Sequence, residues 1–248
     1  MSLHLTNGSK ILSKFFLSLL ILSTFFSACR KENFAPVEDT DIPCLLQTAN
    51  PAGRSYLADS VVSYKCADKF CGILPLSTKN YWVYLDSIFN NGVLLRVQLD
   101  TLRYSTTIKS LADGLVWWEG NLFIGLPETL YANDSAFFSL SDRLFSQDVK
   151  DVRKDFSIPS GDSLKYLANF EDAAAQGRTL KLKTAIKTAA GTFNNCVYFE
   201  KNAPFYLKDQ VYFKPGLGVI KYIQEKAPMG ERFIKLQQIS TLVAVHIE

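Results

Sequence analysis

The stretch YWVYLDSIFNNGVLLRVQLDTLRYS, Tyr81 to Ser105, decides the fold class. Both halves are rich in aromatic and β-branched residues, which favour extended backbone. Asn90, Asn91 and Gly92 separate the halves, and an Asn-Gly pair between such runs is the strongest short-range signal of a β-hairpin. A type I′ turn needs a positive φ at both central residues, which asparagine and glycine tolerate. The stretch therefore predicts two long antiparallel strands.

The rest of the chain repeats this pattern. Residues 115–126, LVWWEGNLFIGL, predict a hairpin that turns at Gly120 and Asn121. Residues 218–247 predict another, with its turn at residues 228–230. The glycines of GLG in residues 216–218 indicate a tight turn, because no helix and no third glycine follow to form a dinucleotide-binding loop.

Helical patterns are fewer. Asp134 could cap a helix whose apolar residues recur at 3.6-residue spacing between Phe137 and Phe145. Residues 163–177, SLKYLANFEDAAAQG, end at a glycine and predict another short helix. The predicted fold class is mainly β: an antiparallel, strongly curved sheet, or an open barrel or sandwich, with one or two short helices.

The N-terminal residues have the pattern of an export signal. Lys10 and Lys14 precede an apolar run, residues 15–26, that is shorter than the roughly 20 residues needed to cross a bilayer. A basic segment, a short apolar run and small residues before a cleavage site are typical of a secretory signal.

Residues 26–29, FSAC, resemble the lipobox of bacterial lipoproteins, with phenylalanine where leucine is usual. The resemblance implies diacylglyceryl transfer to Cys29, cleavage before it and N-acylation of the new terminus. Ordinary secretion, with Cys29 in a disulfide, and an uncleaved anchor are the alternatives. Two or three acyl chains anchor a protein stably in a bilayer, whereas one does so only marginally.

These boundaries predict a signal peptide over residues 1–28, a flexible tether over 29–43 and a single β-rich domain over 44–248. The tether, RKENFAPVEDTDIP, is polar, contains two prolines and shows no periodicity. The predicted location is the outer membrane, on either its periplasmic or its surface face.

The charge balance argues against nucleic acid as a partner. The formal net charge of the 248 residues is +3, and removal of residues 1–28 takes away Lys10, Lys14 and no acidic residue. The remaining charge of +1, without a basic block, would not follow a phosphate backbone. The expected partners are the lipid bilayer, through acylated Cys29, and a protein or glycan of unknown identity.

Four cysteines follow Cys29. We expect one disulfide among Cys44, Cys66 and Cys71, since an oxidising compartment permits pairing. Cys196 lies in an alternating stretch that indicates a buried strand, where a lone thiol is an ordinary core residue. A zinc site is not expected, because no histidine lies nearby.

The residue inventory offers little for catalysis. His4 leaves with the signal and His246 is third from the end, so neither a histidine-based triad nor a histidine metal site is expected, and no cofactor is implied. Asp86 and Asp100 could face each other across the first hairpin, as glycoside hydrolysis would require. Each precedes a hydroxyl residue on a strand, so we expect both to face solvent.

Aromatic residues are the candidate binding groups. Trp117 and Trp118 are adjacent on a strand and point to opposite faces, so one is expected in the core and the other could bind a sugar or a protein. Trp82 and Tyr84 share one face of their strand, and that face is expected to pack inward.

Five sites in which aspartate is followed by serine or threonine and then by an aliphatic residue resemble the short O-glycosylation sequon of Bacteroidota. The acceptors that this resemblance implies are Ser60, Ser87, Thr101, Ser135 and Ser163.

Four phrases, LPLSTKNYWVY, DFSIPSGDSL, GTFNNCVYFE and YFKPGLGVIKY, occur in this order from Leu74 to Tyr222. Together they resemble a loose group of uncharacterised Bacteroidota lipoproteins, and the resemblance implies no established activity. The leading hypothesis is a non-enzymatic, membrane-anchored binding module. The alternatives are an enzyme that acts on glycans through carboxylates and a carrier of apolar ligands in an enclosed cavity.

Overall fold

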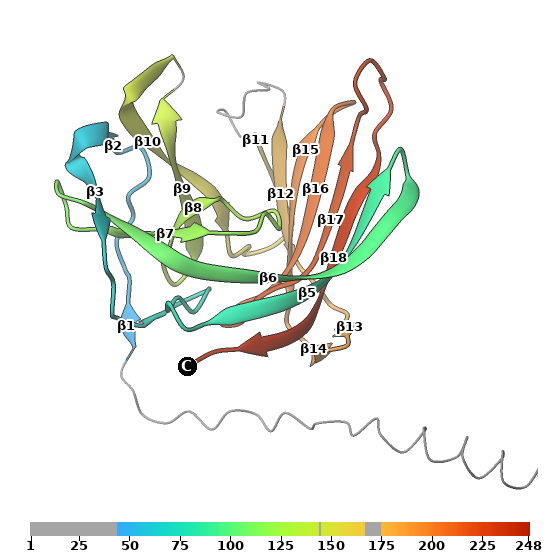
Figure 1. The fold of residues 1–248 in the computed structure, drawn as a ribbon, viewed down its shortest axis with the longest axis horizontal. Helices are drawn as coiled ribbons and strands as arrows, with labels where there is room; N and C mark the ends of the chain where they lie inside the picture. Colours follow the sequence, from blue (N-terminus) through green and yellow to red (C-terminus); the bar gives the residue numbers. More distant parts are fainter. Residues whose placement is uncertain (1–43, 144, 167–174) are drawn as a thin grey trace, which may run out of the picture. The chain divides into compact units, whose positions relative to one another are not determined.

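A computed structural model describes residues 44–143, 145–166 and 175–248 of the chain (Figure 1). All of them lie in one compact unit, Pro43–Glu248. The predicted signal and the whole predicted tether, Cys29 included, lie outside the described residues.

Within these ranges the regular structure consists of strands and one short 3₁₀ turn, η2 (Ala58–Ser60). The strands are β1 (Leu45–Leu46), β2 (Ser55–Leu57), β3 (Val61–Tyr64), β4 (Phe70–Cys71), β5 (Tyr81–Asn90), β6 (Val93–Ser110), β7 (Val116–Gly120), β8 (Thr129–Ala132), β9 (Ala136–Arg143), β10 (Ser146–Ser157), β11 (Ser163–Tyr166), β12 (Gln176–Lys181), β13 (Ile186–Thr188), β14 (Gly191–Phe193), β15 (Val197–Ala203), β16 (Leu207–Lys214), β17 (Gly218–Lys226) and β18 (Lys235–His246).

One large antiparallel sheet dominates the domain. Its strands run in the order β11-β12-β15-β16-β17-β18-β5-β6-β7-β8-β9-β10-β2, and β3 pairs with β6 beside this path. Two small sheets, β1-β4 and β13-β14, complete the topology. The mainly β, antiparallel fold class is thereby confirmed.

The first predicted hairpin is confirmed and organises the whole sheet. Asn91 and Gly92 adopt φ angles of 52° and 80°, as a type I′ turn requires. Strand β6 spans 18 residues, so its first part pairs with β5 and its last part pairs with β7 and β3. Figure 1 shows β6 running across both halves of the sheet.

The sheet curves until its two ends pack against each other like the layers of a sandwich. Phe156 of β10 stacks on Phe199 of β15, with ring centroids 4.6 Å apart. Phe137 of β9 meets Phe213 of β16 edge to face at 5.2 Å. Apolar side chains from both ends therefore share one core.

The predicted helix between Phe137 and Phe145 is wrong, because this segment forms β9. Phe137 and Phe138 point to opposite faces and are both buried, in two different hydrophobic clusters. A strand that is covered on both faces carries apolar residues without alternation, so its spacing resembles that of a helix. The second predicted helix lies largely in residues 167–174, outside the described residues, and β11 and β12 flank it.

In the second predicted hairpin the first strand forms as β7, but the strand that pairs with it is not the predicted one. Strand β7 pairs with β8, Thr129–Ala132, and not with residues 122–126. That intervening segment packs Ile124 and Leu126 into the core instead. The third predicted hairpin is confirmed as β17-β18.

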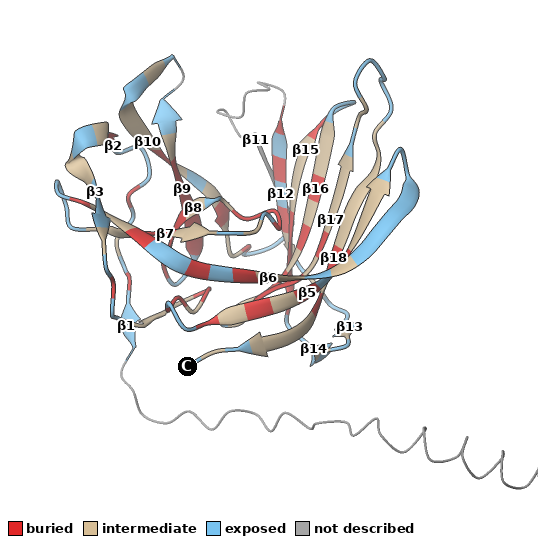
Figure 2. Cartoon of the chain, in the orientation of Figure 1, coloured by how far each residue is buried: buried red, intermediate tan, exposed pale blue. Residues whose placement is uncertain are grey.

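Two hydrophobic clusters stabilise the domain. The larger contains Trp82, Tyr84 and Trp118, and the smaller contains Trp117, Tyr131 and Phe138. Figure 2 shows buried residues on β5, on the middle of β6, on β9 and on β16. Because Trp117 and Trp118 are neighbours on β7, this strand separates the two clusters.

Candidate functional site

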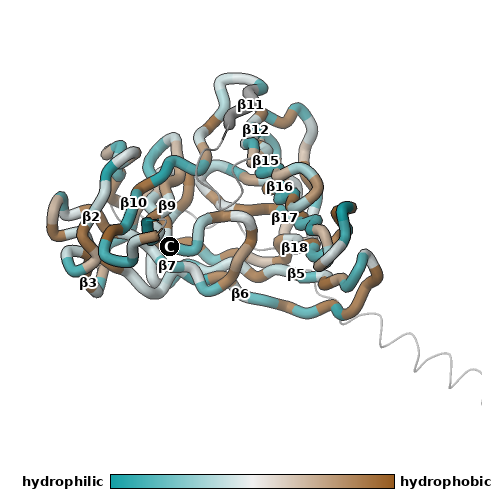
Figure 3. The backbone as a smooth tube through the Cα atoms, turned by 90° about the horizontal axis from the view of Figure 1, so that it is seen from above, coloured by the Kyte–Doolittle hydropathy of each residue, from teal (hydrophilic) through white to brown (hydrophobic). Residues whose placement is uncertain are grey.

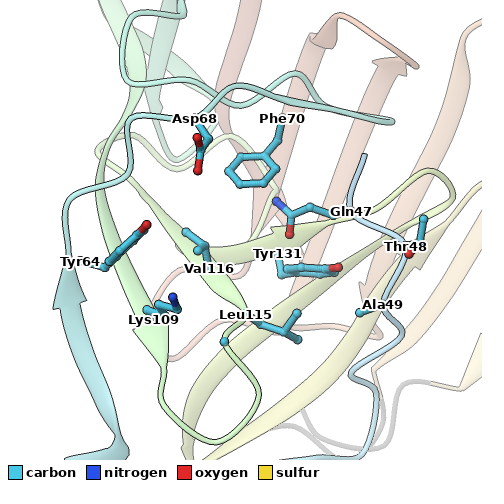
Figure 4. Close-up of a pocket in the computed structure, with 11 residues that line it drawn as sticks. Gln47, Thr48, Ala49, Tyr64, Asp68, Phe70, Lys109, Leu115, Val116 and Tyr131 are labelled. Carbon is cyan, nitrogen blue, oxygen red and sulfur yellow. The ribbon is translucent and has the colours of Figure 1, made fainter. Parts of the chain in front are cut away.

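A cavity of about 350 Å³ opens near the N-terminal end of the described domain, within the size range of small-ligand pockets (Figure 4). The segment that follows β1 forms one wall, with Gln47 and Ala49. Asp68, which precedes β4, and Phe70, which begins β4, form the next wall. The lining is completed by side chains from four strands of the large sheet: Tyr64, Lys109, Val116 and Tyr131.

A disulfide and a hydrogen bond hold the first wall in place. Cys44 and Cys71 form a disulfide, with Cα atoms 5.5 Å apart, which links β1 to β4. The Asn133 side-chain amide donates a hydrogen bond to the carbonyl of Ala49 at 3.1 Å. These restraints matter because β1 has two residues and too few backbone hydrogen bonds to fix the wall alone.

The polar groups of the cavity differ in charge. Lys109 places its Nζ 4.9 Å from the centre of the Tyr64 ring, a cation–π contact. Asp68 brings a carboxylate to the opposite part of the lining in the view of Figure 4. The cavity therefore offers both a cation and an anion to a ligand, together with apolar lining from Phe70 and Val116.

Gln47 carries an unused hydrogen-bond donor. Its side chain is buried, and its Nε2 has no hydrogen-bond partner among the residues that the structure describes. Figure 4 shows this amide between the rings of Phe70 and Tyr131. A buried amide without a partner loses the free energy of its hydrogen bond to water, so such groups are rare in folded proteins.

Tyr131 contributes a neutral phenol. Burial raises the pKa of Tyr131, and the backbone at Ala49 offsets this only in part. The hydroxyl therefore stays protonated at physiological pH. Close by, burial also raises the pKa of the Cys66 thiol, which disfavours the reactive thiolate.

The cysteines have distinct environments. Cys44 and Cys71 are bonded to each other, whereas Cys66 and Cys196 are free and buried. The backbone N–H of Cys66 donates to Oγ1 of Thr107 at 3.3 Å, which fixes the chain beside the cavity. Burial likewise raises the pKa of Cys196.

The idea that Trp117 or Trp118 is exposed for binding is wrong. Both indoles are fully buried, because clusters of apolar side chains cover both faces of β7. Trp118 packs edge to face against Phe70 at 5.9 Å, so it lies behind the cavity wall and not on the surface.

The glycosylation candidates stay predictions, and their exposure differs. Ser135 is exposed, while Ser60, Ser87 and Thr101 are half-buried. Ser163 begins β11, and its side chain lies outside the described part of the chain.

The expectation that Asp86 faces solvent is wrong. Asp86 is 1% exposed, and its Oδ2 accepts a hydrogen bond from the Gln238 side-chain amide at 3.4 Å. Burial, with a further contribution from Asp100, raises the pKa of Asp86 to about 6. Asp100 is half-buried on β6, where it pairs with Tyr84.

His246 lies on the outer face of the sheet. It is exposed and stacks on Tyr81 at 5.2 Å, while the Arg103 guanidinium lies 4.6 Å from the same ring. This aromatic and cationic stack joins β18, β5 and β6.

Among the described residues no group of three or more histidine, cysteine, aspartate or glutamate side chains could hold a metal ion. In the same part of the chain, no helix has the length and apolar character needed to cross a membrane.

Sequence reasoning missed the cavity residues Gln47, Tyr64, Asp68 and Lys109. They come from four segments that share no motif, and three of them lie on or beside short strands. The one available signal was the sequence CADKFC, residues 66–71, in which the disulfide cysteine Cys71 follows a charged stretch that includes Asp68.

No model of a known protein family matches the chain, and no curated protein matches it. Two solved structures are similar. A candidate lipoprotein from Parabacteroides distasonis ATCC 8503 is 14% identical, with a TM-score of 0.33 over 71% of this chain and 99% of that one. A candidate exported protein with a YmcC-like fold from Bacteroides fragilis NCTC 9343 is 11% identical, with the same TM-score and coverage. The proposals below depend on this chain's own residues.

Proposed function

We propose that the chain is a lipid-anchored, non-enzymatic protein of the bacterial outer membrane whose β domain binds a small polar ligand. The cavity of about 350 Å³, lined by Lys109, Asp68 and the buried Gln47, is the observation that carries the binding role. The signal, the FSAC motif ending at Cys29 and the polar tether support the anchored location.

The chemistry of the cavity defines the ligand class. Gln47 and Lys109 present donors, Asp68 presents an acceptor, and Phe70 offers an aromatic edge. A ligand with an acidic group near Lys109 and hydroxyl groups near Asp68 matches this arrangement, as an acidic sugar would. The charged side chains do not suit a carrier of apolar ligands, because such a ligand would leave them without water or partners.

Fluorescence titration tests the binding role. Trp118 contacts the cavity wall through Phe70, so occupancy should change the tryptophan emission. The probes are glucose, glucuronate and glucosamine, which share one ring but are neutral, anionic and cationic. We expect glucuronate to bind at least tenfold more tightly than glucose, because its carboxylate meets Lys109.

Lys109→Met keeps the apolar stem and removes the charge. It should reduce glucuronate affinity about tenfold, whereas Lys187→Met, at an exposed position on β13, should leave it unchanged. Equal binding of all three sugars to wild type and variant, or no saturable signal, would reject the cavity as the ligand site.

The anchor has a separate test. Cys29→Ser should release the protein from the membrane fraction of its native host, and intact-mass analysis of wild type should show the acyl chains. An unmodified Cys29, or a serine variant that still sediments with membranes, would reject the lipid anchor without affecting the cavity.

A further inference from the structure

Three hairpin tips lie at the same end of the large sheet. The hairpins β15-β16, β17-β18 and β5-β6 follow one another in the antiparallel order of the sheet, so their turns face the same way. Figure 1 shows these tips together at the upper right of the view. We call residues 89–96, 203–208 and 225–235 the hairpin rim.

The rim is a connected structure. The backbone N–H of Ala227 donates a hydrogen bond to the carbonyl of Tyr206 at 2.9 Å, which joins two of the tips. Lys226 places its Nζ 5.6 Å from the centre of the Tyr206 ring. In the sheet, Leu207 pairs with Lys226 and Lys226 pairs with Lys235.

Large apolar side chains project from all three tips into solvent. Phe205 is 75% exposed, Phe233 77% and Val93 71%. The other exposed apolar or aromatic members are Leu94, Leu95, Tyr206 and Met229. Figure 3 shows the tip of β5-β6 as a strongly hydrophobic segment. Single exposed apolar residues are normal, but seven on neighbouring turns mark an interaction surface.

The backbone conformation of Phe205 is independent evidence that the exposed side chains of the rim have a function. The Tyr206 N–H bonds to the Ala203 carbonyl at 3.0 Å, which closes a turn with Phe205 at its third position. Phe205 has a φ of 66°, in the left-handed region where a turn of this kind favours glycine. An exposed phenylalanine there strains the backbone without filling the core, and such strain points to a functional requirement.

The charge of the rim indicates the kind of partner. It contains five basic residues and two acidic ones, so its formal charge is +3, whereas the domain without the signal is almost neutral. The basic residues are Arg96, Lys208, Lys226, Arg232 and Lys235. Aromatic and aliphatic tips flanked by lysine and arginine match the boundary between lipid headgroups and acyl chains, where long basic side chains reach phosphates.

From this geometry we infer that the hairpin rim docks on the surface of an anionic phospholipid bilayer. The seven apolar side chains enter the headgroup region, and Arg96, Lys226 and Arg232 bind lipid phosphates. Lys208 and Lys235 form ion pairs with Glu200 and Glu231. The rim would orient the domain on the membrane, which an acyl chain at the end of a tether does not do. The rim contains none of the cavity residues, and the domain of residues 43–248 does not include Cys29, so the test of the rim is independent of both earlier proposals.

The test uses the domain of residues 43–248, which contains the described sheets, both hydrophobic clusters and the disulfide. Vesicles of phosphatidylglycerol and phosphatidylcholine are compared with vesicles of phosphatidylcholine alone by co-sedimentation. We expect binding to the anionic vesicles that is at least tenfold stronger and that weakens with added salt. The combined variant F205S/M229S/F233S should lose at least 90% of this binding.

The matched control removes exposed apolar area elsewhere. Leu57 and Leu111 are 61% and 65% exposed and lie away from the rim, so L57S/L111S should bind like wild type. Equal binding of the rim variant and the control would overturn the inference. A second result would also overturn it: wild type does not bind vesicles but forms a concentration-dependent dimer, and the rim variant does not form this dimer. The rim would then be the contact surface for a second copy of the chain.

Phe205→Gly separates membrane contact from folding. Glycine relieves the positive φ, so the variant should melt at the same or a higher temperature than wild type. Its vesicle binding should nevertheless fall at least threefold. A variant that binds vesicles as wild type does would show that the phenylalanine has no role at the bilayer.

Discussion

At the scale of single residues, Asp86 shows how alternation along a strand outweighs local composition. Trp82, Tyr84 and Asp86 are two residues apart on β5, so all three point to the same face. The first two were expected to pack inward, and Asp86 follows them into the core. The adjacent serine suggested solvent exposure, but the covered face of the sheet decides the outcome.

The raised pKa of Asp86 predicts a specific dependence of stability on pH. In the folded state this pKa is about 6, against an ordinary value of 3.8 for aspartate, so between these two values the folded protein keeps a proton that the unfolded chain has lost. The contribution of this group to stability is therefore greatest below about pH 4 and falls as pH rises through about 6.

Asp86→Asn should remove this dependence, because an amide remains neutral at every pH in this range. At about pH 7 the variant should be more stable than wild type by about 2 kcal/mol, with allowance for solvent screening, and at about pH 4 the two should be equal. Urea unfolding across this range measures the difference, with exposed Asp59→Asn as the control. A stability gap that does not change with pH would contradict the raised pKa of Asp86.

Gly218→Ala should be strongly destabilising. Gly218 has a φ of 132°, and a Cβ there would lie 2.8 Å from Nε1 of Trp82. That nitrogen donates to the carbonyl of Leu217 at 2.7 Å, so the added methyl would displace a buried indole from its partner. We expect a loss of about 2 kcal/mol or more. Gly161→Ala, with ordinary φ and open space, should be nearly neutral in the same thermal melts.

At the scale of elements, predictability follows how locally each element is determined. Hairpin β5-β6 was predictable because Asn91 and Gly92 fix the turn and the flanking alternation fixes the register. Strand β9 was not, because packing on both faces removes the alternation. The cavity was not predictable either, since its walls come from segments that only the curvature of the sheet brings together.

The disulfide holds β1 in place, because a strand of two residues has too few backbone hydrogen bonds to do so alone. C44A/C71A should reduce the free energy of unfolding by about 3.5 kcal/mol, from the entropy of a loop closed over a separation of 27 residues. Because Gln47 follows β1, glucuronate binding should weaken as well. Chemical denaturation and the fluorescence titration measure the two effects. The control is Cys66→Ala, a small change at a free thiol, and unaltered binding in the double variant would show that the wall is held by other contacts.

At the scale of the whole molecule, one sheet connects two cores. Strand β6 pairs with β5 near the larger cluster and with β7 between the clusters, so neither core has a sheet of its own. The aromatic contacts of Phe156 with Phe199 then close the curved sheet on itself. Loss of either core would expose strands that the other core needs.

The two clusters should therefore unfold in one transition. W82F/W118F leaves Trp117 in the smaller cluster, and W117F/W118F leaves Trp82 in the larger. In each variant, the denaturant midpoint from tryptophan fluorescence should equal the midpoint from far-UV circular dichroism, because both report the loss of the same sheet. Each variant is its own control, since the two probes are read on one sample. If Trp117 became exposed at a lower denaturant concentration than the loss of strand signal, the smaller core would be an independent unit. The continuity of β6 would then not couple the halves.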